Sequence, residues 1–333
     1  MVDPMDTIKN HGDTSWTRPE TARVLLDSAG SIHGPRDTGY DTYEFQVGPD
    51  TVEVTAFLSY TGAPLFLHVY GPNGYRGTVM KPSATGHVTL TARCSAFSAS
   101  PGIVAGSLEP GTWTLLLDHG PDLEYAAYTL VVTERRGTPG AHVERALPGP
   151  HAVSGTAGWY RGELHTHSEE SDGACSPADV ARAAEAKGLD FVSLTDHCTI
   201  SGWYPMRETL SGSTLLIRGC EITGRRGHAN LHGINTPIDP AADRPERGLN
   251  EIAEDVHAQG GIFCVNHAFS AVLGWRADDF EWDRADAMEV IHALDRPGNN
   301  LLLGLWDHHL KCGRRRGMEN RRLAGLPESG GGY

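Results

Sequence analysis

The feature that most constrains the fold is the alternation of strand-like and helix-like segments after residue 160. In "SPADVARAAEAKG", Ser176 suits a helix N-cap, Pro177 the first helical position and Gly188 the C-terminal stop. Strand, helix and strand in succession predict parallel pairing, and so an α/β barrel or an open sheet. We expect strands in residues 161–167, 191–197, 214–223, 228–234, 262–268 and 287–293, and helices around 249–261 and 299–313.

The first part of the chain follows a different pattern. Between about residues 40 and 134, runs rich in β-branched and aromatic residues, such as "TVEVTAFLSY" and "YTLVVTE", are separated by turn signals. Short strands at regular spacing predict an all-β, antiparallel β-sandwich. The stretch "RRGTPGAHVERALPGP" then reads as a linker. We therefore expect a β-sandwich domain over 20–136, a linker over 137–158 and an α/β domain over 159–333.

Charge and composition narrow the range of partners. The chain has 28 basic and 42 acidic residues, a net charge of −14, which disfavours non-specific binding to nucleic acid or to an anionic membrane. It has no apolar run suited to a signal peptide or a membrane span. The six cysteines are scattered singly and are expected to be free thiols. These features predict a cytoplasmic protein with a small-molecule partner, and they carry no signal for a particular oligomeric state.

The stretch "GELHTHSEESDG" contains the first candidate metal ligands. Side chains two apart on a strand share a face, so His165 and His167 can approach one ion together, with Asp172 close behind. The other candidate ligands stand at or near strand ends: His197, Glu221, His228 and His267. Each alone would be an ordinary buried polar group, but together they favour a metal site. Imidazole and carboxylate without sulfur suit zinc, manganese or iron. Glu169 and Glu170 are expected to lie in an exposed turn and to hold no ion.

Two further positions have alternative interpretations. Asp196, directly before His197, is predicted to orient a neighbouring histidine, as ligating imidazoles commonly require, or else to cap the following turn. His232 is an alternative to His228, because residues four apart along a twisted strand can keep one face. The remaining histidines, such as His257 and His292, are expected to be structural.

Four stretches carry a resemblance to a known family: "GELHTHSEESDG", "GLDFVSLTDHCTISGW", "RGCEITGRRGHANLHGIN" and "GIFCVNHAF". In order and spacing they resemble the successive motifs of the PHP (polymerase and histidinol phosphatase) superfamily, and most closely the CehA/McbA group of metallohydrolases similar to carbaryl hydrolase. The resemblance covers about residues 160–311, and a β-sandwich accompanies the barrel in that group. It implies a distorted (β/α)7 barrel of PHP type with two or three divalent ions.

The resemblance also implies a division of the ligands among the ions. His165 and His167 would hold the first ion, Glu221 would bridge, His228 and His267 would complete a second, and Asp172 with His197 would serve a third. The "GH" at Gly227 and His228 matches the family better than His232 does. Glu221 and Asp196 are the residues expected to take part in catalysis.

The end of the chain departs from the family pattern. Members close the site with Asp-x-His on the last barrel strand, but residues 312–333 contain neither an apolar strand nor that motif. Asp307, His308 and His309 spell it within a predicted helix, where i and i+2 diverge by about 200° and cannot share an ion. We expect them on a solvated face. The sequence thus predicts a chain truncated at its C-terminus, with a barrel that lacks its last strand.

These observations predict a metal-dependent hydrolase whose ions activate water, with a phosphoester as the expected substrate. The first alternative is a carbamate or carboxylic ester hydrolase of the carbaryl hydrolase type. The second is a non-catalytic protein in which a degenerate barrel binds metal or a partner without turnover. The sequence has no Gly-x-Ser-x-Gly element of a serine hydrolase and no Gly-rich phosphate loop.

Overall fold

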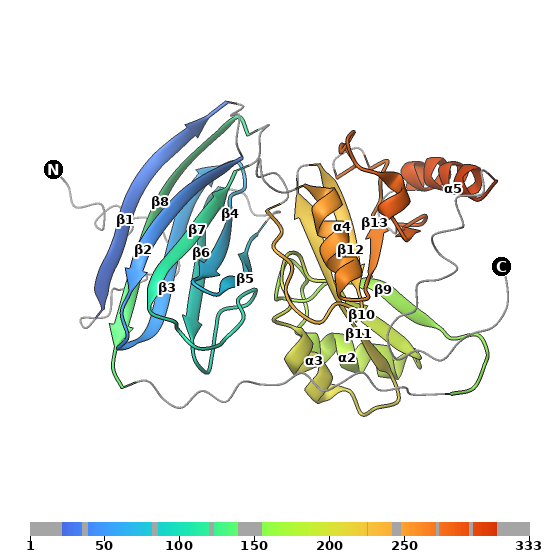
Figure 1. Cartoon of the computed structure of the whole chain (residues 1–333), viewed down its shortest axis with the longest axis horizontal. Helices are drawn as coiled ribbons and strands as arrows, with labels where there is room; N and C mark the ends of the chain where they lie inside the picture. Colours follow the sequence, from blue (N-terminus) through green and yellow to red (C-terminus); the bar gives the residue numbers. More distant parts are fainter. Residues whose placement is uncertain are drawn as a thin grey trace.

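A computed structural model of the chain describes residues 22–34, 39–81, 86–119, 123–138, 155–224, 226–241, 248–270, 273–292 and 296–311. Eight strands come first in the chain and lie together on one side of the molecule (Figure 1). They are β1 (Arg23–His33), β2 (Tyr40–Val47), β3 (Thr51–Gly62), β4 (Phe66–Gly71), β5 (Gly74–Val79), β6 (His87–Ser95), β7 (Gly111–Asp118) and β8 (Tyr125–Arg136).

These strands form two four-stranded antiparallel sheets, in the orders β1-β8-β3-β6 and β2-β7-β4-β5. Alternate residues point inward, as in β6, where Val88, Leu90 and Ala92 are buried between exposed neighbours. Both sheets contribute to one apolar core; Leu58 of the first sheet and Trp113 of the second are fully buried in it. The two sheets are the layers of a β-sandwich.

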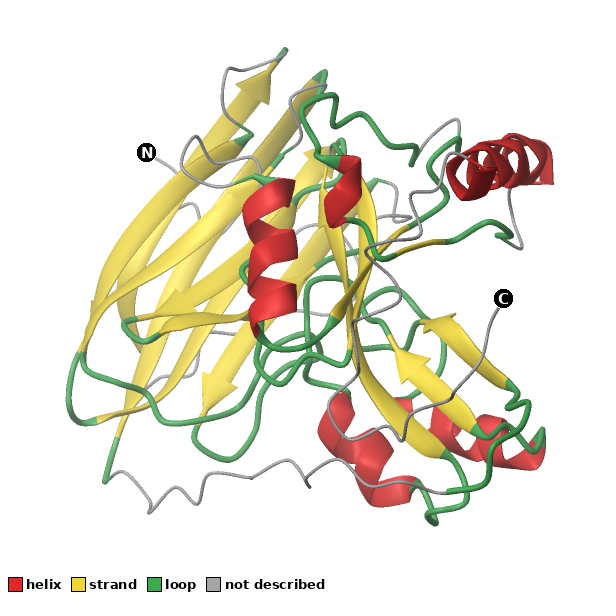
Figure 2. Ribbon diagram, turned by 45° about the vertical axis from the view of Figure 1, so that its right-hand side comes forward, coloured by secondary structure: helices red, strands yellow, loops and turns green. Residues whose placement is uncertain are grey.

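The second part of the chain contains six strands, four α-helices and one 3-10 helix in its described residues. The strands are β9 (Gly162–Thr166), β10 (Phe191–Leu194), β11 (Leu215–Gly224), β12 (Gly227–His232), β13 (Ile262–Val265) and β14 (Ala287–Met288). The helices are α2 (Pro177–Ala186), α3 (Trp203–Thr209), α4 (Leu249–Ala258), α5 (Arg296–Lys311) and the 3-10 helix η2 (Trp282–Arg284). The strands form one sheet in the order β14-β13-β12-β11-β10-β9, seen in Figure 2 with α2 and α3 packed together beneath it.

The pairing in this sheet is mixed, which corrects the prediction of parallel pairing throughout. Strands β9, β10 and β11 are parallel, but β12 is antiparallel to both β11 and β13. Gly224 pairs with Gly227, so a tight hairpin connects β11 to β12 directly. A turn this short leaves no room for a crossover helix and requires antiparallel strands.

Local helix signals are confirmed at α2. The Ser176 hydroxyl accepts a hydrogen bond from the Asp179 amide at 3.1 Å, Pro177 opens the helix, and Gly188 adopts a positive φ of 61° just past its end. The predicted helix containing Asp307 is α5, where that carboxylate pairs with Lys311 one turn away. Helix α3 was not predicted, since its seven residues carry no clear apolar periodicity.

The seven-stranded barrel is not seen in the described residues, which form an open six-stranded sheet. Residues 312–333, on which the predicted truncation rests, and most of the predicted linker, residues 139–154, lie outside the described part. No described helix is both long enough and apolar enough to cross a membrane.

Candidate metal centre

The candidate metal centre is built around the carboxylate of Glu221 in β11. This side chain is fully buried. Five imidazole nitrogens lie within 3.5 Å of its two oxygens, from His165, His167, His197, His228 and His267. A buried carboxylate is stable only if protons or cations compensate its charge.

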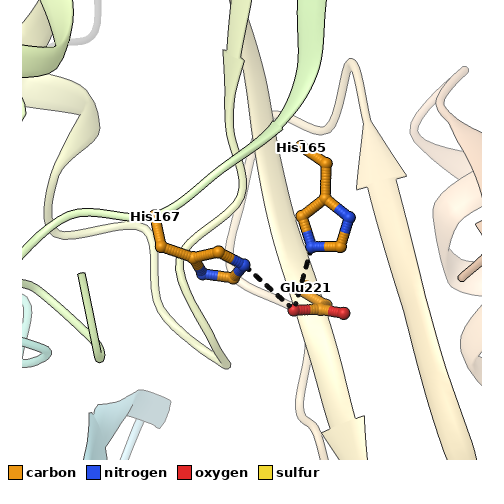
Figure 3. Close-up of side chains that lie close together, drawn as sticks. All are labelled: His165, His167 and Glu221. Carbon is orange, nitrogen blue, oxygen red and sulfur yellow. Dashed lines mark ion pairs between the residues drawn. The ribbon is translucent and has the colours of Figure 1, made fainter. Parts of the chain in front are cut away.

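Three imidazoles approach one oxygen, Glu221 Oε2. The Nε2 atoms of His165 and His167 both lie 3.4 Å from it (Figure 3). They converge because the two residues are separated by one position at the end of β9 and point to the same side. His197, which follows β10, brings its Nδ1 to 2.9 Å from the same oxygen.

The other oxygen, Glu221 Oε1, faces a second set of groups. His228 Nδ1 in β12 lies 3.2 Å from it, and His267 Nε2 in the segment after β13 lies 3.5 Å from it. The Asn266 amide donates a hydrogen bond to it at 2.8 Å. Each oxygen of Glu221 therefore faces its own imidazoles, which is the arrangement a bridging carboxylate requires.

Asp172 forms an outer cluster with two of these histidines. Its Oδ1 lies 3.6 Å from His167 Nδ1 and 3.5 Å from His197 Nε2. In the described residues, three triplets bring ligand atoms within 4.8 Å of one another: His165, His167 and Glu221; His167, Asp172 and His197; and His197, Glu221 and His228. A neutral imidazole has one lone pair, so a shared histidine binds the ion of only one triplet.

The spacing of these atoms fits ligands around an ion. Ligands about 2.1 Å from a tetrahedral ion lie about 3.4 Å apart, which matches the contacts of His165 and His167 with Glu221. Several buried atoms here also have no hydrogen-bond partner of acceptable geometry: Glu221 Oε2, His167 Nδ1 and His267 Nδ1. Such atoms are rare in proteins unless an ion or ordered water contacts them. The donor set thus suits divalent cations that accept nitrogen and oxygen ligands.

The electrostatics of the cluster reflect its buried negative charge. Burial opposes ionisation of Glu221, but the charges of His197 and His228 outweigh it and hold the pKa of Glu221 well below its usual range. Burial likewise lowers the pKa of His165, but the carboxylates of Glu221 and Glu289 outweigh it and raise that pKa to about 10. Without a metal ion, protons therefore compensate the carboxylates.

One residue of the cluster and one residue next to it have unusual backbone conformations. Cys198, which follows His197, has a φ of 52°, and His267 has a φ of 27°. Positive φ is costly for side chains other than glycine and persists where surrounding contacts enforce it. Both unusual conformations therefore lie where an imidazole contacts Glu221: His267 itself makes such a contact, and Cys198 directly follows His197.

Three groups near the centre were missed by the sequence analysis. Glu289, just after β14, lies with Oε1 3.1 Å from His165 Nδ1 and accepts the backbone amide of His267 at 3.1 Å. Asn266 contacts Glu221, as described above. His292, which was expected to be structural, has its ring 5.0 Å from that of His267. The predicted strand over 287–293 contains Glu289 and His292, but no local pattern marked either residue as part of the site.

Among the described residues, Asp196 hydrogen-bonds to serines and not to a histidine, which corrects its predicted orienting role. It accepts hydrogen bonds from the amide and hydroxyl of Ser168, both at 2.6 Å, and from the Ser171 hydroxyl at 2.7 Å. These bonds do not cap the turn after His197 either. Because Asp196 faces the loop between β9 and α2, it fixes the loop that carries Asp172. Burial raises its pKa.

His232 was the alternative to the preferred His228, and Glu170 was expected to be exposed. His232 pairs through Nδ1 with the Ser193 hydroxyl at 2.9 Å and belongs to none of the three triplets, whereas His228 contacts Glu221. Glu170 is partly buried and accepts two hydrogen bonds, in contrast to the exposed Glu169. The fold thus brings His228, and not His232, into contact with Glu221.

Fold and site together define a class of protein: an α/β sheet that carries a buried cluster of imidazoles and carboxylates of the kind that holds divalent metal ions. The family model of the PHP domain matches residues 163–293. An uncharacterized protein of Methanocaldococcus jannaschii is 30% identical over 161 residues, which are 43% of this chain and 89% of that protein. The chain belongs to the PHP family.

Two further comparisons cover smaller shares of the other protein. A 3',5'-nucleoside bisphosphate phosphatase of Chromobacterium violaceum is 31% identical over 93 residues, so that 28% of this chain matches 33% of that enzyme. A crystal structure from Bacteroides vulgatus, of a two-domain protein containing a predicted PHP-like metal-dependent phosphoesterase, is 22% identical with a TM-score of 0.34, over 39% of this chain and 44% of that one. The chain thus spans less than half the length of these two proteins.

Proposed function

We propose that the protein is a metal-dependent phosphoesterase that acts on a small molecule. The observation that carries this proposal is the buried Glu221 carboxylate, whose two oxygens face separate sets of imidazoles. The family supports the proposal, and so does the partial match to a nucleoside bisphosphate phosphatase. Divalent ions in such a site supply activation of water and neutralisation of negative charge on the substrate.

The residues of the chain have separate tasks in this proposal. His165 and His167, which contact Glu221 Oε2, would hold one ion with Glu221, and His228 and His267, which contact Oε1, would hold a second. The negative charge of Glu221 would offset the repulsion between two neighbouring cations. Two neighbouring groups orient the candidate ligands: Glu289 contacts the imidazole of His165, and Asn266 donates a hydrogen bond to Glu221.

Asp172 and His197 of the outer cluster would hold one more ion. We propose zinc, manganese or iron as the native metal, because the donors are nitrogen and oxygen. We also propose that the open sheet is an incomplete version of the (β/α)7 barrel of the family and that the chain belongs to the CehA/McbA branch. The carbamate or carboxylic ester activity of that branch is not favoured by any of the relatives found.

The test is metal analysis combined with a substrate panel. The purified chain is stripped of metal, reloaded with manganese or zinc, and assayed on chromogenic phosphomonoesters, phosphodiesters and aryl esters. We expect at least two bound ions and turnover of a phosphoester. Glu221→Gln keeps the size of the side chain but removes its charge, so we expect it to retain the fold, lose at least one ion and lose turnover. Glu169→Gln, in the exposed position nearby, is the control and keeps both.

Each result separates the proposal from its alternatives. Turnover of aryl esters alone would support the ester hydrolase. Bound metal without turnover on any substrate would support the non-catalytic protein. Full metal occupancy in the Glu221 variant, or an equal loss in the Glu169 variant, would show that Glu221 is not the bridge.

A further inference from the structure

Two hydrogen bonds cross from the β-sandwich to the two loops that carry Asp172 and His197. We propose that the sandwich positions the outer cluster of His167, Asp172 and His197, with Tyr75 and Glu170 as the positioning residues. The inference rests on the proposed function, because it gives the sandwich a task in the same metal centre.

The first contact fixes the backbone next to His197. The Tyr75 hydroxyl, from β5, donates a hydrogen bond to the carbonyl of Cys198 at 2.6 Å. The Cys198 amide donates to the carbonyl of Glu221 at 2.8 Å. Both polar backbone groups of Cys198 are therefore held, one by the sandwich and one by β11, at a residue with a costly positive φ. Burial raises the pKa of Tyr75, which keeps the hydroxyl protonated as a donor.

The second contact fixes the loop that carries Asp172. Glu170, two residues before Asp172, accepts a hydrogen bond from the Gly102 amide of the sandwich at 2.8 Å. The same oxygen, Oε2, accepts the Ser201 hydroxyl at 2.6 Å, and Ser201 belongs to the loop after His197. One carboxylate oxygen thus joins the sandwich and both ligand-bearing loops.

The outer cluster depends on such support more than the inner one. The side chain of Asp172 is 33% exposed, against 1% for Glu221. Glu221 is held by a strand and by surrounding side chains, whereas Asp172 lies in a loop that burial does not immobilise. Ligand atoms must stay within about 0.2 Å of their ideal distances, so a mobile loop weakens metal binding. The sandwich contacts restrain this loop from a second side, in addition to the hydrogen bonds that Ser168 and Ser171 donate to Asp196.

The sandwich makes a similar contact elsewhere, which provides a matched control. The Tyr70 hydroxyl donates to Asp239 Oδ1 at 2.7 Å, on a segment after β12 that carries no candidate ligand. Tyr70 and Tyr75 are neighbours, with ring centroids 5.1 Å apart. Removal of either hydroxyl weakens the docking of the two parts, but only Tyr75 contacts a ligand-bearing loop.

The experiment compares two pairs of variants of the full chain. Tyr75→Phe is paired with Tyr70→Phe, and Glu170→Ala with the exposed Glu169→Ala. Each metal-free protein is titrated with Co²⁺, followed by visible absorption and by metal counting, and its Tm is recorded. We expect Tyr75→Phe and Glu170→Ala to weaken one ion by about 10- to 100-fold, the range for loss of a partner behind the ligands. In both test variants the remaining ions bind as in the wild type. The controls Tyr70→Phe and Glu169→Ala keep the wild-type affinity for every ion and the wild-type spectrum.

Unchanged Co²⁺ affinity in both test variants would overturn the inference. An equal loss in all four variants would also overturn it, because the sandwich would then act only through general docking. A wild type that binds no Co²⁺ contradicts the proposed function instead. In that case hydrogen exchange in residues 168–173 and 197–201 of the metal-free protein tests the positioning role. Faster exchange in the two test variants alone supports it, and unchanged exchange refutes it.

Discussion

Replacement of Gly173 by alanine is the sharpest test of how the loop positions Asp172. An alanine Cβ at Gly173 would lie 2.6 Å from the carbonyl carbon and oxygen of His167 and 2.7 Å from the amide nitrogen of Ser168. Carbon atoms pack at about 3.5 Å or more, so these two stretches of backbone must separate by about 0.9 Å. Because the contacts are with backbone, no side-chain rotation relieves them.

That displacement exceeds the tolerance of a metal site. Asp172 Oδ1 already lies 3.6 Å from His167 Nδ1, and ligand distances must hold to about 0.2 Å. We expect Gly173→Ala to lower the free energy of unfolding of the metal-free protein by about 1–3 kcal/mol, the usual cost of overpacking. We also expect it to weaken the ion of the outer cluster by at least about tenfold and to disturb the ion that His167 would share with Glu221 Oε2, while the ion on Glu221 Oε1 stays bound.

Two measurements check this expectation. Denaturant unfolding in EDTA gives the stability, and metal counting across a Mn²⁺ or Co²⁺ titration gives the occupancy. Gly158→Ala is the matched control, because its Cβ would meet nothing within 4 Å and its φ is not left-handed. If Gly173→Ala matched Gly158→Ala in both stability and occupancy, the loop would yield without moving Asp172, and the reasoning would be wrong.

The remaining predictions concern the inner cluster. His165→Ala should lose most of the first ion because it removes a candidate ligand nitrogen. Cys264→Ala should lose little metal, because its buried thiol donates to the Val265 carbonyl and not to Glu221. Metal counting that shows the reverse would mean that the wrong donor was chosen. Glu289→Gln should keep the fold but weaken metal binding by about 10- to 100-fold, because it removes the charged partner of His165 Nδ1, and an unchanged Kd would count against that role. Metal binding at pH 7.5 should release protons, and the affinity should rise with pH. In the metal-free protein nearby carboxylates outweigh burial and raise the pKa of His165 and His197 to about 10, whereas imidazoles that bind metal must be neutral. Calorimetry in two buffers of different ionisation heat checks this, and binding without proton release would contradict it.

Local sequence determined those features that depend on neighbours along the chain. Ser176, Pro177 and Gly188 set the limits of α2, because caps and turn conformations are decided within a few residues. His165 and His167 were predicted to share a face because strand geometry has a period of two, and both reach the same oxygen of Glu221. The family was identified from motifs that are likewise short and continuous.

Tertiary structure decided what depends on residues far apart in the chain. The role of Asp196 was mistaken, because its partner Ser168 lies 28 residues away and nothing local distinguishes it from a histidine partner. The positions of Glu289 and Asn266 beside the histidines follow from the way the strands are ordered in the sheet, which includes the antiparallel β12 and β13. Strand order is set by the packing of the whole apolar core and leaves no periodic signal at any one residue.

The contact between the two parts of the chain is the clearest case of this kind. Tyr75 and Cys198 are separated by 123 residues, and neither "GYRG" nor "HCTI" signals a partner. The hydroxyl belongs to the part of the chain built on one apolar core and the carbonyl to the part built on the other, so their hydrogen bond depends on how the two parts pack together. The sequence predicted which residues are candidate ligands, and only the packed structure decided which loops are held in place and by which contacts.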